Sequence, residues 1–369
     1  MKIGFDGKRA SQNLTGLGNY SRYVIHLLKK FHAENRYSIY ALKNPNESLL
    51  ITGVDYKYPL RQSFKAFWRS YGIKKNLIED KVDLYHGLSN EIPYGLGKGG
   101  ISTVVTIHDL IFIRFPQYYR LIDRIIYRIK VKYAIAKADR IIAISNQTKR
   151  DLIEYFRVEE AQITVIYQNC DPIFRQQLRQ EYKFAIRQKY DLPENYLLSV
   201  GTIEERKNLM LLVQAVNELE DVHLVVVGRE TNYIKKVKAY IQQNKLNERV
   251  HFLKNVSYID LPAIYQQADI FFYPSRFEGF GIPILEALHS GVPVIAATGS
   301  CLEEAGGSGS IYVDPDDWKG LAEQIKLING NANRKETMVQ AGYLHLKNFD
   351  DQKIAREINQ LYKDVVNHA

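Results

Sequence analysis

The chain has 369 residues, more than one hydrophobic core usually organises, so two domains are expected. Hydrophobic residues make up 46% and charged residues 25%, as in globular proteins, and the apolar runs are far shorter than the roughly 20 residues that cross a bilayer. The two cysteines, Cys170 and Cys301, exclude a disulfide framework and a zinc or redox motif. Because the strand-like start lacks the features of a secretory signal, we expect a cytoplasmic protein.

The formal net charge of +9 is unevenly distributed along the chain. Residues 1–190 hold 32 Lys and Arg against 17 Asp and Glu, whereas the remainder holds 18 against 24. A basic half can bind nucleic acid, an anionic membrane surface or a phosphate-bearing acceptor. Because the chain lacks zinc-finger spacing, an RNP-like aromatic motif and a basic leucine zipper, we do not expect nucleic acid as a partner.

Short β-branched strands alternate with amphipathic helices through the first half, which predicts a parallel sheet with helices on both faces. Helices are expected at 19–31 and 119–137. The expected strands are Lys2–Phe5, Ser38–Leu42, Leu84–His86, Thr103–Ile107, Arg140–Ile144 and Ile163–Ile166.

The second half repeats this alternation, with strands expected at Tyr196–Val200, His223–Val227, Val250–Phe252, Ile270–Tyr273, Val294–Ala296 and Ile311–Val313. The segment 171–193 lacks a clear strand, so the junction is placed there, between an N-terminal domain at 1–175 and a C-terminal domain at 190–348. An amphipathic helix within 350–369 is expected to pack back on the first domain. Two doubly wound sheets have ligand crevices at the carboxyl ends of their strands, so we expect the site between the domains.

The stretch 273–287 is the strongest functional signal. An apolar strand ends there, a glycine-bearing loop follows, and Pro283 suits the first turn of a helix that Gly291 can close. Gly279 and Gly281 allow close backbone approach to a ligand, while free amides at the helix start favour phosphate or hydroxyl oxygens. The stretch therefore predicts a ligand-binding strand, loop and helix.

Two carboxylates, Glu278 and Glu286, bracket this loop, and Glu286 lies among apolar residues, where it needs a polar partner such as paired ribose hydroxyls. Together they form an E-G-F-G-x-P-x-x-E pattern, which resembles the signature of glycosyltransferase family 4. The resemblance implies an α/β GT-B fold, with two Rossmann-like doubly wound domains facing an interdomain cleft. It also implies that Glu278 contacts hydroxyls of the donor sugar and that Glu286 grips the ribose. The donor-binding residues expected here are Gly279, Phe280, Gly281, Ile282, Leu285 and Glu286.

Adjacent cations, Arg206 and Lys207, follow another strand end beside a helix start. Such a pair can bind a diphosphate without a metal ion, and it resembles the family's Arg/Lys pair that stabilises the leaving nucleotide diphosphate. Members with Arg directly after the glycine differ from this chain, in which Thr202 follows Gly201. Arg206 and Lys207 must then carry the charge together. Because no D-x-D motif stands out near this site, we expect no metal and no cofactor, only a nucleotide diphosphate sugar as donor substrate.

In the first half, Gly16 and Gly18 open a helix in the sequence Thr15 to Asn19, and the resemblance directs this loop toward the donor phosphates and the acceptor. His108 ends an apolar strand, next to Asp109. The resemblance places His108 beside the reacting face of the sugar, with Asp109 as a weaker candidate. His86, at another strand end, is expected to be structural.

Two further segments of the second half also fit the resemblance to glycosyltransferase family 4. Gly228 and Arg229 end a strand, where the glycine permits close approach of a nucleotide. The segment 252–257 resembles the family's nucleobase-holding segment, which assigns Phe252, Leu253 and Ser257 to donor binding.

The expected catalytic residues are therefore His108, Arg206, Lys207 and Glu278. The resemblance implies a retaining transfer of a hexose from a UDP-hexose or GDP-mannose to a hydroxyl of a sugar or lipid-linked acceptor, in polysaccharide, lipopolysaccharide or glycolipid synthesis. Two other readings stay open: a catalytically inactive nucleotide-sugar-binding regulator, and a nucleic-acid-binding protein that uses the basic half.

The segment 119–132 interleaves cations with apolar and aromatic residues at helical spacing, as an interfacial helix does. It indicates peripheral contact with an anionic membrane, at its inner face. The alternative is a core-packed helix with a solvated basic face.

Overall fold

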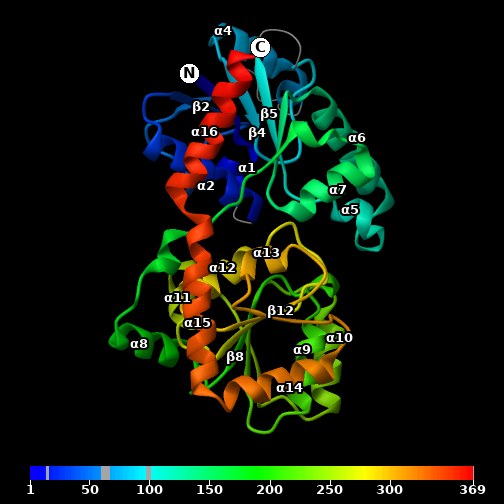
Figure 1. Ribbon diagram of the computed structural model, residues 1–369, viewed down its shortest axis with the longest axis vertical. Helices are drawn as coiled ribbons and strands as arrows, with labels where there is room; N and C mark the ends of the chain where they lie inside the picture. Colours follow the sequence, from blue (N-terminus) through cyan, green and yellow to red (C-terminus); the bar gives the residue numbers. More distant parts are fainter. Residues whose placement is uncertain (14–15, 60–66, 97–100, 369) are drawn as a thin grey trace. The chain divides into compact units, whose positions relative to one another are not determined.

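The computed structural model describes residues 1–13, 16–59, 67–96 and 101–368. These residues form two compact units (Figure 1). The first unit joins Met1–Gln168 to the segment that begins at Phe349, and the second unit spans Asn169–Asn348. The boundary thus falls between Gln168 and Asn169, just before the segment 171–193 in which the sequence analysis placed the junction.

Within the described residues, seven parallel strands form the sheet of the first unit, in the order β3-β2-β1-β4-β5-β6-β7. The strands are β1 (Lys2–Asp6), β2 (Arg36–Tyr40), β3 (Asp55–Lys57), β4 (Leu84–Gly87), β5 (Ser102–Ile107), β6 (Arg140–Ala143) and β7 (Ile163–Val165). The strand order reverses between β1 and β4, which creates the switch point where doubly wound sheets bind ligands. The loops after β1, β4 and β5 meet at this edge.

The helices of the first unit are α1 (Gly7–Gln12), α2 (Gly16–Phe31), α4 (Ile73–Glu79), α5 (Ile111–Arg114), α6 (Leu121–Lys137), α7 (Asn146–Phe156) and α16 (Asp351–Asn367). Most bury an apolar stripe, as α2 does with Val24, Ile25 and Leu28. Helix α6 differs, because its buried residues all lie in its second half, from Val131 onward.

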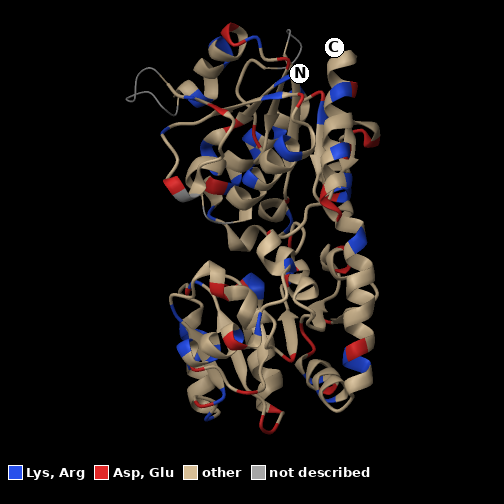
Figure 2. Cartoon of the chain, turned by 90° about the vertical axis from the view of Figure 1, so that its left-hand side faces the viewer, with Lys and Arg blue, Asp and Glu red and all other residues tan. Residues whose placement is uncertain are grey.

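The last helix, α16, is part of the first unit and contacts α2 (Figure 1). Its buried face includes Ile358 and Tyr362, while charged residues recur along the rest of the helix (Figure 2). The Tyr362 hydroxyl lies 2.6 Å from Nδ1 of His86, whose Nε2 lies 2.8 Å from Oγ1 of Thr106. Burial lowers the pKa of His86 to about 3, so its imidazole is neutral. The structure thus gives His86 the structural role expected from the sequence.

Six parallel strands, counted over the described residues, form the sheet of the second unit in the order β10-β9-β8-β11-β12-β13. They are β8 (Leu197–Val200), β9 (Leu224–Val227), β10 (Val250–Leu253), β11 (Ile270–Tyr273), β12 (Val294–Ala297) and β13 (Ile311–Val313). The switch point lies between β8 and β11. The loops that carry Arg206 and Glu278 follow these two strands.

The helices of the second unit are α8 (Gln180–Tyr190), α9 (Leu209–Asn217), α10 (Ile234–Gln243), α11 (Leu261–Tyr265), α12 (Ile282–His289), α13 (Leu302–Gly306), α14 (Trp318–Asn329) and α15 (Ala332–Leu346). Apolar residues of α9, α10 and α14 pack with those of the strands in one continuous core. A tightly packed core therefore supports the carboxyl edge of the second sheet.

The expected α/β architecture with two Rossmann-like parallel sheets is confirmed, and every expected strand is present to within a residue or two at its ends. The sequence did not predict β3, and it expected no helix at α8. Helix α2 begins at Gly16 rather than at residue 19, and α1 precedes it. Gly291 closes α12 as expected, with a φ of 72°.

Candidate active site

The loop between β11 and α12 carries the E-G-F-G pattern. The loop ends at Gly281, the residue before α12. The φ angle of Gly281 is 126°. A Cβ at this position would also lie 3.1 Å from Cδ2 of Leu302. The backbone conformation therefore favours glycine here, and a larger residue would also require the Leu302 side chain to shift slightly. Pro283 occupies the first turn of α12, as predicted.

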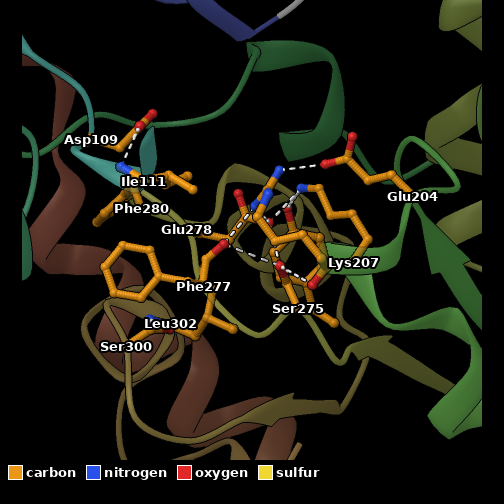
Figure 3. A network of polar contacts seen from close by, with 12 residues as sticks. Asp109, Ile111, Glu204, Lys207, Ser275, Phe277, Glu278, Phe280, Ser300 and Leu302 are labelled. Carbon is orange, nitrogen blue, oxygen red and sulfur yellow. Dashed lines mark hydrogen bonds and ion pairs between the residues drawn. The ribbon is translucent and has the colours of Figure 1, made fainter. Parts of the chain in front are cut away.

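The side chain of Glu278 lies where this loop meets the turn that follows β8. Its Oε1 is 2.6 Å from Lys207 Nζ and 2.7 Å from an Nη of Arg206. The hydroxyl of Ser275 also donates to Oε1, over 2.5 Å (Figure 3). The two predicted cations and the first predicted carboxylate therefore form one cluster.

Electrostatics keep this cluster ionised. Burial raises the pKa of Glu278, but the charges of Lys207 and Arg206 outweigh it, and the pKa falls to about 2. Arg206 also pairs with Glu204 over 2.6 Å. Lys207 Nζ lies 2.5 Å from the Tyr273 hydroxyl. Two cations are thus held at the sheet edge, where an incoming diphosphate would find charge-assisted donors.

Backbone contacts fix the loop against its neighbours. Arg206 donates to the carbonyl oxygen of Phe277 over 2.5 Å. The buried thiol of Cys301 contacts the carbonyl oxygens of Glu278 and Phe280, at 3.0 and 3.1 Å. The cluster is therefore set by packing before any ligand arrives.

The second carboxylate, Glu286, lies within α12 and is buried. Its Oε2 accepts a hydrogen bond from the Tyr265 hydroxyl over 2.8 Å. Burial raises the pKa of Glu286 to about 7, and the nearby charge of Asp171 contributes to the increase. Such a carboxyl is poised between its two charge states near neutral pH.

A cavity of about 590 Å³ opens at the carboxyl ends of β9 and β10. Gly228, Arg229, Phe252 and Leu253 line it, as expected for donor binding. A narrower hollow beside Lys207 shares the wall residues Ile203 and Val226 with this cavity. The surface thus continues from the predicted nucleobase segment toward the cation pair.

The structure shows further contacts or packing at three of the residues assigned to donor binding. Ser257 is not among the described residues that line the cavity, and its backbone N–H donates to the Tyr190 hydroxyl instead. The side chain of Leu285 is fully buried, and its assignment to donor binding stays a prediction. A Cβ on Gly228 would lie 1.7 Å from the carbonyl oxygen of Gly201, so the neighbouring strand end already requires glycine there.

In the first unit, Gly16 and Gly18 begin α2, while Thr15 falls outside the described residues. A Cβ on Gly18 would lie 1.9 Å from the carbonyl oxygen of Asn13. A Cβ on Gly16 would meet nothing within 4 Å. Gly18 therefore has a structural reason to be glycine, whereas Gly16 leaves open space for a ligand.

His108 follows β5 and is buried. Its Nε2 lies 2.9 Å from the carbonyl oxygen of Leu88, which can only accept, so this nitrogen carries the hydrogen. The imidazole and the Tyr20 ring lie nearly perpendicular to each other, with centroids 4.6 Å apart. Burial lowers the pKa of His108 to about 4. The neighbouring Asp109 accepts from the N–H of Ile111 over 3.1 Å.

The models of two protein families match the chain. "Glycosyltransferase Family 4" matches residues 20–172, and "Glycosyl transferases group 1" matches residues 183–345. The chain belongs to glycosyltransferase family 4. It is a glycosyltransferase, as the resemblance of its motifs implied.

Similar proteins include O-antigen chain mannosyltransferase B of Escherichia coli, which is 26% identical over 98% of this chain and 100% of the relative. O-antigen chain mannosyltransferase RfbU of Salmonella typhimurium is 28% identical over 62% of this chain and 61% of its own length. Among solved structures, Anabaena HepE in complex with UDP and glucose has a TM-score of 0.79 at 19% identity, covering 99% of this chain and 100% of that chain. Sucrose-phosphate synthase from Thermosynechococcus elongatus has a TM-score of 0.77 at 18% identity, covering 100% of both chains. These likenesses confirm the GT-B fold.

Several residues of this family 4 site escaped the sequence analysis. Ser275 lies inside the quoted motif, but its contact with Glu278 depends on how the loop folds back. Glu204 stands two residues before Arg206, a spacing that could have suggested their pairing. Tyr265, the partner of Glu286, comes from another helix and left no local signal.

Over the part of the chain that the structure describes, no three His, Cys, Asp or Glu side chains are grouped so that they could hold a metal ion. Likewise, none of the described helices combines the length and apolar character needed to cross a bilayer.

Proposed function

We propose that this glycosyltransferase moves a hexose from a nucleotide diphosphate sugar to an acceptor hydroxyl, with retention of anomeric configuration and without a metal ion. The observation that carries the proposal is the cluster in which Lys207 and Arg206 both contact Glu278 at the carboxyl edge of the second sheet. The cavity beside it offers space for the nucleotide.

The names of the relatives indicate which donor sugars and which products should be tested. Two of them are O-antigen chain mannosyltransferases, which favours mannose as the transferred hexose and an O-antigen-like polysaccharide or lipopolysaccharide as the product. HepE, of the same fold, was solved with UDP and glucose, which keeps UDP-hexoses in the donor panel beside GDP-mannose.

The proposed mechanism follows the charges that develop during transfer. Cleavage of the bond between the sugar and the phosphate leaves positive charge on the sugar ring and negative charge on the departing diphosphate. Lys207 and Arg206, already fixed in place, would stabilise the diphosphate without reorganising. In a retaining transfer, the acceptor attacks on the face of the leaving group, and a phosphate oxygen takes its proton.

The carboxylates bind hydroxyls in this proposal and do not act as a hydrolase pair. Two cations keep Glu278 ionised, which suits it to accept from hydroxyls of the donor sugar. Glu286 would accept from the ribose. The resemblance assigns neutral His108 to the transferred sugar.

Calorimetry and product analysis test the proposal. Purified protein is titrated with GDP-mannose, UDP-glucose and UDP-N-acetylglucosamine, and release of the nucleoside diphosphate is followed with and without EDTA. We expect one donor to bind and turn over in the presence of EDTA. Binding without turnover would indicate the inactive regulator instead, and the absence of binding by every donor would refute the proposed function. Activity that EDTA removes and a divalent ion restores would refute metal independence.

The proposal also includes a membrane contact through the first part of α6. Its apolar side chains are exposed rather than core-packed, with Leu121 65%, Ile122 71% and Ile129 56% exposed. The same helix carries Arg124 and Arg128. Exposed apolar side chains flanked by cations match the interface of an anionic bilayer. The alternative of a core-packed segment does not hold for this half of the helix.

A further inference from the structure

The first unit contains a cavity of its own, which Leu17 and Asp109 help to line. Its volume is about 260 Å³, and it lies between α1, the loop after β4 and the middle of α6. Three cations, Lys8, Arg9 and Lys130, line it. A concave surface with several cations favours an anionic ligand.

Two buried hydrogen-bonding atoms of this cavity lack a partner. Among the described residues, neither Oγ of Ser89 nor Nε of Arg9 has a hydrogen-bond partner, although both atoms are buried. Ser89 is 7% exposed. Buried polar atoms are nearly always satisfied in native proteins, so these two are available as hydrogen-bond donors to a ligand that enters the cavity. Ligand oxygens would satisfy both.

The third donor, Lys8, also lacks a counterion. No carboxylate of the described residues lies within ion-pair distance of its ammonium group. Burial lowers the pKa of Lys8, and the adjacent charge of Arg69 lowers it further. An anion in the cavity would relieve both effects.

The acidic residues of the cavity do not cancel this preference. Glu91 is held by Arg69 over 2.5 Å and by Lys130 over 2.8 Å, so its charge is already balanced. Behind it, Arg69 also pairs with Asp6 over 2.6 Å. The remaining carboxylate, Asp109, gives the cavity a hydrogen-bond acceptor for hydroxyl groups.

An aromatic wall completes the cavity. Tyr127 and Phe112 line it with ring centroids 5.8 Å apart, and Tyr119 lies 6.2 Å from Tyr127. Aromatic faces suit the apolar face of a sugar ring. At about 260 Å³, the cavity has room for one phosphorylated sugar unit and is smaller than the pockets of roughly 300–1,000 Å³ that enclose larger ligands.

We propose that this cavity binds a phosphate-bearing saccharide, with the phosphate at Lys8, Arg9 and Ser89 and the sugar against the aromatic wall. The inference rests on the proposed function, because such a ligand would be the acceptor of the transfer. The phosphate can come from a soluble sugar phosphate or from a lipid-linked one. Helix α6 provides a route for the lipid, since it lines the cavity with Tyr127 and exposes Ile122 on its surface.

Binding measurements with full-length protein test the inference in two arms. The first titrates mannose 1-phosphate, glucose 1-phosphate and the uncharged hexoses by calorimetry. The second measures binding to phosphatidylcholine vesicles with and without a polyprenyl phosphate. Each arm compares the wild type with Arg9→Met and Ser89→Ala. We expect at least a tenfold loss of affinity for the phosphate-bearing probe in both variants, and no binding of uncharged hexoses at the same concentrations.

Ser11→Ala is the matched control. The Ser11 hydroxyl is also buried without a partner among the described residues, but Ser11 does not line the cavity. Its replacement is expected to leave binding unchanged. A response in the soluble arm identifies a sugar phosphate, and a response confined to the vesicle arm identifies a lipid-linked phosphate. Absent binding in both arms, or equal loss in Ser11→Ala, would overturn the inference. Donor binding by the wild type, measured separately, shows whether the proposed function fails independently.

Discussion

Tyr265 donates its hydroxyl hydrogen to Oε2 of Glu286 over 2.8 Å, which ties the carboxylate of α12 to α11. One hydrogen bond does not offset the loss of water around this carboxyl, so its pKa stays at about 7. The folded protein therefore binds a proton at Glu286 more tightly than the unfolded chain does, for which the usual value is 4.5.

Glu286 should make stability depend on pH between 4.5 and about 7. Because the folded pKa is raised, its contribution to the free energy of unfolding is full below 4.5 and is lost as pH rises through 7. The loss is on the order of 3 kcal/mol. Urea denaturation at several pH values would measure it, and Glu286→Gln should flatten the dependence. Glu278→Gln is the control, since the pKa of Glu278 is lowered to about 2 and its contribution is lost only as pH falls from 4.5 toward 2.

Replacing Lys207 should impair catalysis more than stability. Lys207→Ala removes one of the two cations at Glu278, and loss of such a preorganised donor typically lowers turnover by about 10²-fold. Steady-state rates with the preferred donor measure this, with circular dichroism to confirm folding. Lys235→Ala, an exposed lysine of the same unit, should keep the wild-type rate. A rate within a few-fold of wild type in Lys207→Ala would remove this lysine from the diphosphate site.

The two glycines at the start of α2 should respond differently to alanine. Gly18→Ala forces a Cβ against the carbonyl oxygen of Asn13, so we expect destabilisation of about 1–3 kcal/mol. Gly16→Ala meets open space and should leave the melting temperature nearly unchanged. Differential scanning fluorimetry measures both effects. A drop in transfer rate with unchanged stability in Gly16→Ala would support a ligand at this position, while equal melting temperatures in the two variants would contradict the crowding at Gly18.

The exposed apolar half of α6 should control membrane binding. Asparagine at Ile122 and Ile125 removes two side chains that are 71% and 50% exposed, so folding should be preserved. We expect at least tenfold weaker sedimentation with anionic vesicles, and binding that falls with added salt. Leu344→Asn, which changes a leucine 64% exposed in the second unit, is the control. Wild-type protein that stays in the supernatant with anionic vesicles would refute the membrane contact.

Residue patterns predicted the fold well because buried parallel strands leave continuous apolar runs. Strand β9, with four buried residues in sequence, shows this directly. Strand β3 was missed because Asp55–Lys57 is a three-residue edge strand without an apolar run. Helix α8 was missed because Ile186 is its one buried residue among those described, which leaves almost no helical periodicity to detect.

The site was predicted where one short motif determines it and missed where distant segments meet. Arg206, Lys207 and Glu278 were found because strand ends and glycines mark them, and the structure brings them together. The sequence could not show that Tyr265 faces Glu286. Nor could it show that Gly228 abuts the backbone of Gly201, because a required glycine looks the same whether a ligand or a neighbouring strand occupies the space.

Helix α16 follows the whole second unit in sequence, yet it belongs to the first unit. Until α16 has been synthesised, the surface of the first unit that packs against Ile358 and Tyr362 stays uncovered. The second unit is continuous in sequence and can finish folding before those residues emerge. We therefore expect the first unit to complete its core only after the second unit has been made, when α16 docks on it.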